Sequence, residues 1–252
     1  MRTYTLSGKG AEVHVRFSPT IDLANTPHEI ALVSLQTAHT VTNIKEGYND
    51  LHYAVPVDDG KGHITYESYV MKLPPGTYTI DDVNVYIYSA LREQFKDTDA
   101  KTKMHFMLDG EENTQKCRIS TSFRLDFDHA GSVGPLLGFT RKVHPTAFGE
   151  FVYSDQNVTL VKDFNVIVTC NVVESGYINN RRAHVLHQFH IDKRPSTIFE
   201  VRPPEKVFHR VTRNWIDDIT IRLENPEGQL IPLRSDTELV VTLLLRTAHD
   251  DI

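Results

Sequence analysis

The sequence predicts an all-β protein, an antiparallel β-sandwich or barrel with one or two short helices. The first observation is alternation: Val13, Val15 and Phe17 fall on one side of an extended chain and charged residues fall on the other, as in a half-buried strand. The second is that about a dozen such runs are separated by turn signals, which is typical of sandwiches and barrels. The runs cover residues 12–17, 30–35, 51–55, 64–73, 103–108, 117–127, 158–161, 164–173, 184–191, 198–201, 219–223 and 239–245.

The turns between these runs favour antiparallel pairing. The Asp-Asp-Gly-Lys-Gly sequence at 58–62 predicts a hairpin. Asn225-Pro226-Glu227-Gly228 has proline at the second and glycine at the fourth position of a type I turn. Connections this short favour antiparallel neighbours, because parallel strands need crossovers of about a dozen residues or more.

One helix stands out against this background. Ile87, Leu91 and Phe95 recur at i, i+4 and i+8, and the carboxylates of Asp81 and Asp82 precede them as capping groups. This spacing predicts a helix near 81–95. A second, shorter helical turn is expected within residues 131–139.

Composition narrows the class of protein. The chain has 252 residues and a net charge of −6, whereas domains that coat nucleic acid carry a clear basic excess. Cys117 and Cys170 are the only cysteines and are expected to be buried as small apolar side chains. Residues 1–10 have no secretory signal pattern, and no run approaches the roughly 18 apolar residues that span a bilayer. We therefore expect no membrane span and synthesis in the cytosol.

Three histidines form the most tempting chemical cluster, because His184, His187 and His190 fall within seven residues. On a strand, however, side chains alternate, so His184 and His190 would face one side and His187 the other. A closed metal site needs converging ligands. We therefore expect no metal site in this run.

Carboxylate pairs are the second candidate for chemistry. They occur at Asp81-Asp82, Glu111-Glu112 and Asp217-Asp218. Adjacent side chains point apart on a strand or a helix, so none of these pairs makes an acid–base dyad. Local nucleophile and phosphate-binding motifs are missing as well. The sequence therefore predicts a protein without catalytic residues, cofactor or metal.

Charge is uneven in the second half of the chain. The region 181–213 holds eight basic residues and three acidic ones. The simpler interpretation is solvated strand edges, where Lys and Arg discourage aggregation. The alternative is weak contact with an acidic partner or with DNA packaged in a particle.

Taken in order, these segments resemble a family of minor capsid proteins of the penton type, encoded by polintons (Maverick elements, a class of transposable element) and adintovirus-like double-stranded DNA viruses. The most distinctive parts are the Pro-Gly-x-Tyr-x-Ile-Asp-Asp sequence at 75–82 and the Leu-Leu-Gly-Phe sequence at 136–139. The resemblance extends over residues 1–8, 17–23, 29–35, 43–44, 73–83, 132–139, 165–179, 184–189, 228–234 and 238–244.

The resemblance implies a jelly-roll fold and a structural role without enzymatic activity. It implies a homopentamer around a five-fold axis, in contact with a double jelly-roll major capsid protein. The place of action would be the virion, with synthesis in the host cytoplasm and assembly there or in the nucleus.

Two arrangements of lobes stay open, tandem jelly rolls or one jelly roll with an insertion. The loop 140–149, which contains Pro145, is the best boundary. It predicts an N-terminal jelly-roll-like lobe at 1–145, which contains the helix, and a C-terminal one at 146–252.

Two other functions are compatible with a β-sandwich. One is a ligand- or glycan-binding module, for which Tyr48, Tyr53, Tyr66 and Tyr69 are the candidate aromatic residues. The other is a cupin-like metalloenzyme, which would use the histidines. Fold alone does not separate these roles.

Overall fold

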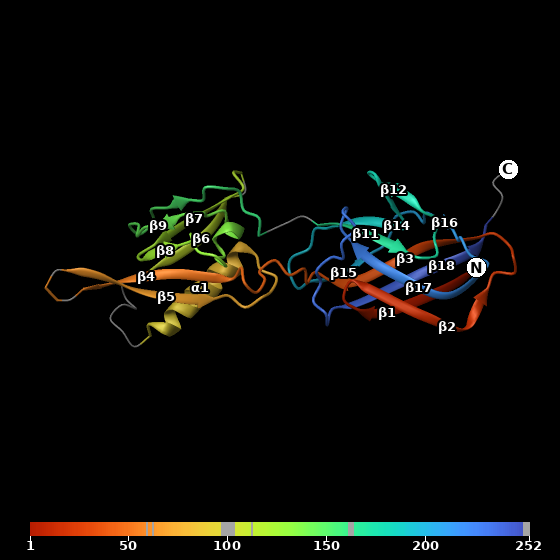
Figure 1. Cartoon of the computed structure of the whole chain (residues 1–252), viewed down its shortest axis with the longest axis horizontal. Coiled ribbons are helices and arrows are strands. Elements are labelled where there is room, and N and C mark those ends of the chain that lie inside the picture. The colour runs from red at the N-terminus through yellow and green to blue at the C-terminus, as the bar shows by residue number, and fades with distance from the viewer. Residues whose placement is uncertain (59, 62, 97–103, 112, 161–163, 249–252) are drawn as a thin grey trace. The chain divides into compact units, whose positions relative to one another are not determined.

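The computed structural model describes residues 1–58, 60–61, 63–96, 104–111, 113–160 and 164–248. The chain divides into two compact units, one made of Met1–Val41 with Asp163–Ile252 and the other of Thr42–Lys162 (Figure 1). Each unit has its own sheets and its own core.

The first unit is a jelly roll. Its strands lie in the orders β1-β18-β3-β15 and β14-β11-β17-β2, and every pairing within them is antiparallel. Eight antiparallel strands divided in this way between two sheets are the jelly-roll arrangement, so we call this part the jelly-roll unit. The strands are β1 (Arg2–Lys9), β2 (Glu12–Asp22), β3 (His28–Ala38), β11 (Phe164–Cys170), β14 (Val185–Ile191), β15 (Ile198–Val201), β17 (Trp215–Glu224) and β18 (Glu238–Thr247).

Shorter strands complete the jelly-roll unit. The strands β12 (Gly176–Ile178) and β13 (Arg181–Ala183) form a hairpin, and β16 (His209–Arg210) pairs with β3. The core lies between the two sheets and holds Leu6, Val13, Val168, Ile221 and Val241, each at most 2% exposed. The alternation in the sequence thus supplies one apolar face from each sheet.

The second unit is inserted between β3 and β11, so we call it the inserted unit. One sheet has the order β5-β4-β8-β9 and the other the order β10-β7-β6, again with antiparallel pairings. The elements are β4 (Asp50–Asp58), β5 (Ile64–Lys72), α1 (Ile80–Gln94), β6 (Phe106–Glu111), β7 (Lys116–Thr121), β8 (Arg124–Asp126), the 3-10 helix η2 (Gly134–Leu137), β9 (Lys142–Val143) and β10 (Val152–Tyr153).

The helix α1 begins with a capping box. The backbone N–H of Asp82 donates to Thr79 Oγ1 at 3.1 Å, and the backbone N–H of Thr79 donates to Asp82 Oδ2 at 2.8 Å. Val83, Ile87 and Leu91 are buried in the core of the inserted unit. The expected helix near 81–95 and its capping carboxylate are confirmed.

Most expected strands are present, and so is the short helical turn, which is η2. Two expectations differ from the structure. The run 117–127 is broken between β7 and β8, and residues 158–160 form no strand. The all-β sandwich with a jelly-roll lobe is therefore confirmed, and it takes the form of one jelly roll with an insertion.

The boundary expected at 145–146 lies inside the inserted unit, and the chain divides instead near residues 41 and 163. The backbone N–H of Thr146 donates to Thr121 O at 2.7 Å, and Val152 pairs with Ile119 in the sheet. The loop with Pro145 is therefore held within one unit. No helix among the described residues is long and apolar enough to cross a membrane.

Candidate functional site

The three clustered histidines do not converge. His184 Nδ1 donates to Val173 O at 2.6 Å, and His187 and His190 are three residues apart on β14, which places them on opposite faces. Burial lowers the pKa of His187, and nearby His209 lowers it further. Within the described part of the chain, no group of three or more His, Cys, Asp or Glu side chains could hold a metal ion.

Described residues of the carboxylate pairs cap a helix, accept a hydrogen bond or form ion pairs. Asp82 caps α1, as described above, and Glu111 ends β6 and accepts a hydrogen bond from Thr114 Oγ1 at 2.6 Å. Glu112 lies outside the described residues. Arg213 Nη1 lies 3.2 Å from Asp217 and 3.4 Å from Asp218, which makes that pair part of an ion cluster.

Both cysteines are buried, as expected from the sequence. Each is 0% exposed. Burial raises the pKa of Cys117 to about 12 and that of Cys170 to about 11. Both thiols are therefore protonated at neutral pH and are poor nucleophiles.

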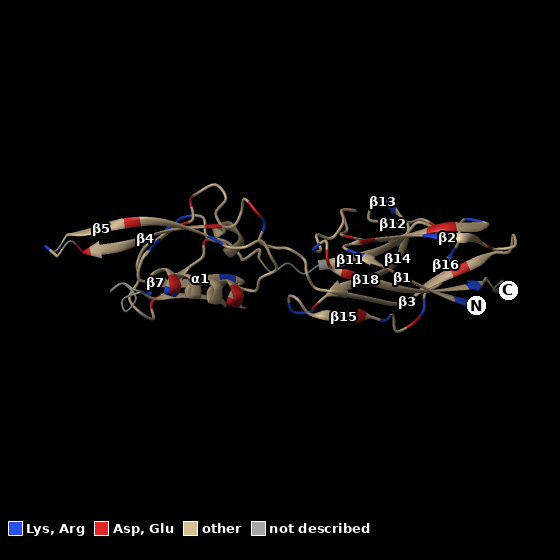
Figure 2. Cartoon of the chain, turned by 90° about the horizontal axis from the view of Figure 1, so that it is seen from below, with Lys and Arg blue, Asp and Glu red and all other residues tan. Residues whose placement is uncertain are grey.

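The basic region 181–213 does not present its charges as one free surface. Arg181, Lys193, Arg202 and Arg213 each form an ion pair with a carboxylate. Figure 2 shows basic and acidic segments interspersed along the ribbon of the jelly-roll unit. Contact with DNA through this region stays a prediction.

The four tyrosines divide between different places. Tyr53 is 2% exposed and stacks on Tyr69 on the inner face of the sheet, with ring centroids 5.5 Å apart. Tyr66 is three residues from Tyr69 on β5, so it lies on the outer face. Tyr48 lies in a turn before β4 and is 64% exposed. Only Tyr66 presents its ring to the outer face.

That outer face carries a hollow of about 480 Å³. Ala54 on β4 lies opposite Ser68 on β5 and opposite Arg124 on β8. Residues directly opposite in antiparallel strands share a face, so a small side chain lies between two larger ones and forms the floor. We call this hollow the Arg124 groove, defined by Ala54, Tyr66, Ser68 and Arg124 with His52 and Asp126 in the next row.

The guanidinium of Arg124 lies over the ring of Tyr66. Its central carbon is 3.6 Å from the ring centroid, the geometry of a cation–π contact. Such stacking holds the guanidinium plane and leaves the N–H groups at its edge available. Among the described residues, no carboxylate forms an ion pair with Arg124.

The second row of the groove is electrostatically balanced. Asp126 Oδ2 lies 2.8 Å from Lys142 Nζ and 3.3 Å from His129 Nε2. Burial opposes ionisation of Asp126, but the bonds from Lys142 and from the Asp128 backbone, with the charges of Lys142 and His129, lower its pKa overall. Asp126 is therefore ionised at neutral pH and is compensated by Lys142.

His52 and His129 close one end of the Arg124 groove as a stacked pair. Their ring centroids are 4.1 Å apart and their planes differ by 19°. The nitrogen lone pairs of imidazole lie in the ring plane, so the nitrogens of two stacked rings do not converge on one point. This pair is therefore a wall of the groove and not a metal site.

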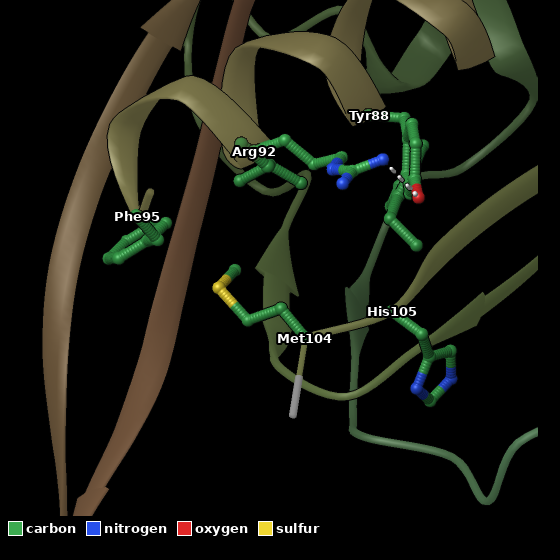
Figure 3. Close-up of a pocket in the computed structure, with 7 residues that line it drawn as sticks. Tyr88, Arg92, Phe95, Met104 and His105 are labelled. Atoms are coloured by element: carbon green, nitrogen blue, oxygen red, sulfur yellow. Dashed lines mark hydrogen bonds between the residues drawn. The ribbon is translucent and has the colours of Figure 1, made fainter. Parts of the chain in front are cut away.

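A smaller hollow, of about 150 Å³, lies between the last turn of α1 and the start of β6 (Figure 3). Arg92 Nη1 donates to the hydroxyl of Tyr88, one turn earlier on α1, at 3.4 Å. Residues 97–103, which join these elements, lie outside the described residues. We assign no binding role to this hollow.

Sequence reasoning missed the groove residues Arg124 and Asp126. Both fall in the predicted strand 117–127, two residues apart, and therefore on one face. Their spacing was a usable signal. What the sequence does not show is that β8 pairs with β4, which brings them beside Ala54 and His52.

No protein-family model matches the chain, and no curated protein matches it in sequence. Among solved structures, a crystal structure of selenomethionine-labelled mavirus penton protein is similar to it. The two are 10% identical and align over 98% of this chain and 99% of that chain, with a TM-score of 0.48. At this TM-score and identity the similarity carries no weight for function, and the jelly-roll topology rests on this chain's own strand pairings.

Proposed function

We propose that the chain is a structural minor capsid protein of the penton type, a vertex subunit without enzymatic activity. The observation that carries the proposal is the strand order of the jelly-roll unit, an arrangement that viral shells use. Lectin domains and cupins use it too, so fold alone does not choose the function. The sequence resemblance to polinton and adintovirus-like penton proteins favours the capsid role.

The most distinctive parts of that resemblance have clear structural roles. The Pro-Gly-x-Tyr-x-Ile-Asp-Asp sequence ends in the capping box of α1. The Leu-Leu-Gly-Phe sequence ends η2, where Leu137 and Phe139 are buried and Gly138 has a φ of 80°. These residues support the proposal through the fold, because they cap a helix, form a turn or pack in the core of the inserted unit.

Self-association as a homopentamer is part of the proposal. The jelly-roll unit exposes large apolar side chains, including Tyr177 at 75%, Ile198 at 69% and Trp215 at 61%. Buried aromatic side chains contribute strongly to protein interfaces. We propose that neighbouring copies and a double jelly-roll major capsid protein cover part of this surface in the virion.

The remaining features of the proposal concern location. The subunit would be made in the host cytoplasm and assembled there or in the nucleus, by a virus or an integrated element of the polinton type. Contact with packaged DNA through 181–213 would be weak, because four of its basic residues already form ion pairs.

The first test is the mass of the purified protein in solution, measured by light scattering after size exclusion at several concentrations and salt strengths. We expect a species of about five times the chain mass of 28.7 kDa that persists on dilution. A monomer would then be mixed with a double jelly-roll major capsid protein from the same virus or element. A monomer that also fails to bind that protein would contradict the proposal.

A further inference from the structure

We propose that the Arg124 groove of the inserted unit is a binding site for a small carboxylate-bearing ligand, with Arg124 as the residue that holds the carboxylate. This inference does not depend on the capsid role, because it rests on a surface within one unit of a single chain. Its volume, about 480 Å³, falls in the usual range of small-molecule sites, about 300–1,000 Å³.

The shape of the groove follows from the register of three strands. Ala54 lies directly between Ser68 and Arg124, so a methyl group stands where the neighbouring rows carry larger side chains. Arg124 and Tyr66 come from the strands on either side of β4 and meet over it, so a ligand in the hollow would lie against the guanidinium, with Ser68 among the other residues that line it. His52 and His129 would bound it at one end.

The charge of the groove selects an acidic ligand. Asp126 and Lys142 offset each other at 2.8 Å. Glu67, also on β5, accepts a hydrogen bond from Tyr69 on the other face of the sheet. Within the part of the chain that the structure describes, the guanidinium of Arg124 is therefore the one fixed charge of the groove that no carboxylate pairs with.

The guanidinium is also oriented before any ligand arrives. Its stacking on Tyr66 at 3.6 Å fixes the plane in which the N–H groups lie. A guanidinium edge matches the two oxygens of a carboxylate, and a preset side chain loses less entropy on binding. The same stacking covers a face of the Tyr66 ring, so a neutral sugar has less of that ring to pack on.

The test is saturation-transfer difference NMR on the whole protein with three probes: glucuronate, acetate and glucose. This measurement works for a monomer and for a large assembly, so it does not depend on the oligomeric state. We expect signals from glucuronate and acetate that weaken with added salt, and none from glucose. Acetate binding without glucuronate binding would support a site for a smaller acid. Equal binding of glucose and glucuronate would overturn the proposal.

Variants then assign the site. Arg124→Gln should lower the affinity for glucuronate at least tenfold. Arg124→Lys should lower it by a smaller factor, because lysine keeps the positive charge but lacks the paired N–H donors of the guanidinium. Ala54→Leu should also abolish binding, since it fills the hollow. The matched control is Arg92→Gln, which removes an arginine whose guanidinium carbon lies 5.6 Å from the ring centroid of Tyr88 elsewhere in the same unit.

Circular dichroism checks that each variant is folded. Unchanged glucuronate binding in folded Arg124→Gln would overturn the assignment, as would an equal loss in Arg92→Gln. If Ala54→Leu does not fold, Ala54→Val takes its place as the smaller filling substitution.

Discussion

Leu6 in the first strand lies directly opposite Val241 in the last strand, and both are buried in the jelly-roll core. The two ends of the chain are therefore held in one sheet. The inserted unit leaves this framework after Val41 and returns to it at Asp163. Its core is a separate cluster, and all of its strand pairings are internal.

We predict that a fragment of residues 42–162 folds by itself. It contains both sheets of the inserted unit and α1. Its core residues Phe123, Phe139 and Ile87 belong to one buried cluster, and each is 0% exposed. Dispersed amide resonances and a cooperative thermal transition would bear this out. A fragment without a transition would show that the jelly-roll unit is needed to hold it.

Much of the fold could be predicted, because alternation marks every long strand that has several buried residues. The short strands that escaped detection are β9, β10 and β16, with two residues each, and β12 and β13, with three, and all are too short to show a period. The first strand, β1, has Leu6 as its single buried residue. Such strands are defined by their neighbours in space and not by their own pattern.

The unit boundaries could not be predicted for a related reason. The chain passes between units near residues 41 and 163 without a proline or glycine at either place. The loop at 140–149 has the composition of a linker, yet Thr146 is bonded to Thr121. Composition reports local flexibility, whereas a boundary depends on which distant strands pair.

The Arg124 groove was partly accessible from the sequence. Because side chains alternate along a strand, Tyr66 and Tyr69 are expected on opposite faces of their strand, and Arg124 and Asp126 on the same face of theirs. The stacking of Arg124 on Tyr66 joins residues 58 positions apart. That contact depends on β4 lying between β5 and β8, which no local pattern reveals.

Gly138→Ala should destabilise the inserted unit strongly. Gly138 has a φ of 80°, and a Cβ there would clash with the backbone oxygen of Gln156. Gly149→Ala is the matched control, because its φ is 87° but no atom lies within 4 Å of the added Cβ. We expect the control to cost about 1 kcal/mol for the left-handed backbone and Gly138→Ala to cost more than about 3 kcal/mol. Equal losses in urea unfolding would show that the backbone at Gln156 gives way.

Arg181→Met should weaken the jelly-roll unit through a buried carboxylate. Glu224 is 4% exposed, and Arg181 Nη1 lies 3.1 Å from its Oε2. Breaking a buried pair costs about 3–5 kcal/mol. Arg181 is one-third exposed and Arg222 remains 3.5 Å from Glu224, so we expect a loss of about 1–3 kcal/mol.

Arg202→Met provides the comparison for Arg181→Met, because Arg202 pairs with Glu200 on the surface, with 74% of its side chain exposed. Urea midpoints measured on both variants should differ clearly, and the surface variant should match the wild type. A loss of similar size in both would mean that the burial of Glu224 is not the cause.

The jelly-roll unit should lose stability as the pH falls, through His187 and His209. Burial lowers the pKa of His209, against a smaller opposing effect of its bond with the Leu186 backbone, and burial with the nearby His209 lowers the pKa of His187. His209 Nε2 is buried without a hydrogen-bond partner among the described residues. In the unfolded chain both imidazoles take up protons near pH 6.5, whereas in the folded unit they stay neutral to lower pH.

The unfolded state therefore binds more protons between the folded-state pKa values and about pH 6.5. Across that window the free energy of unfolding decreases as the pH is lowered. The variant His187→Gln/His209→Gln cannot take up these protons, so its jelly-roll transition should lose much of this pH dependence in urea unfolding at pH 7.5 and 5.5. The inserted unit is an internal control, because burial lowers the pKa of His105 there and the variant leaves it in place. If the double variant keeps the full acid sensitivity of the wild type, the protons are bound elsewhere in the jelly-roll unit.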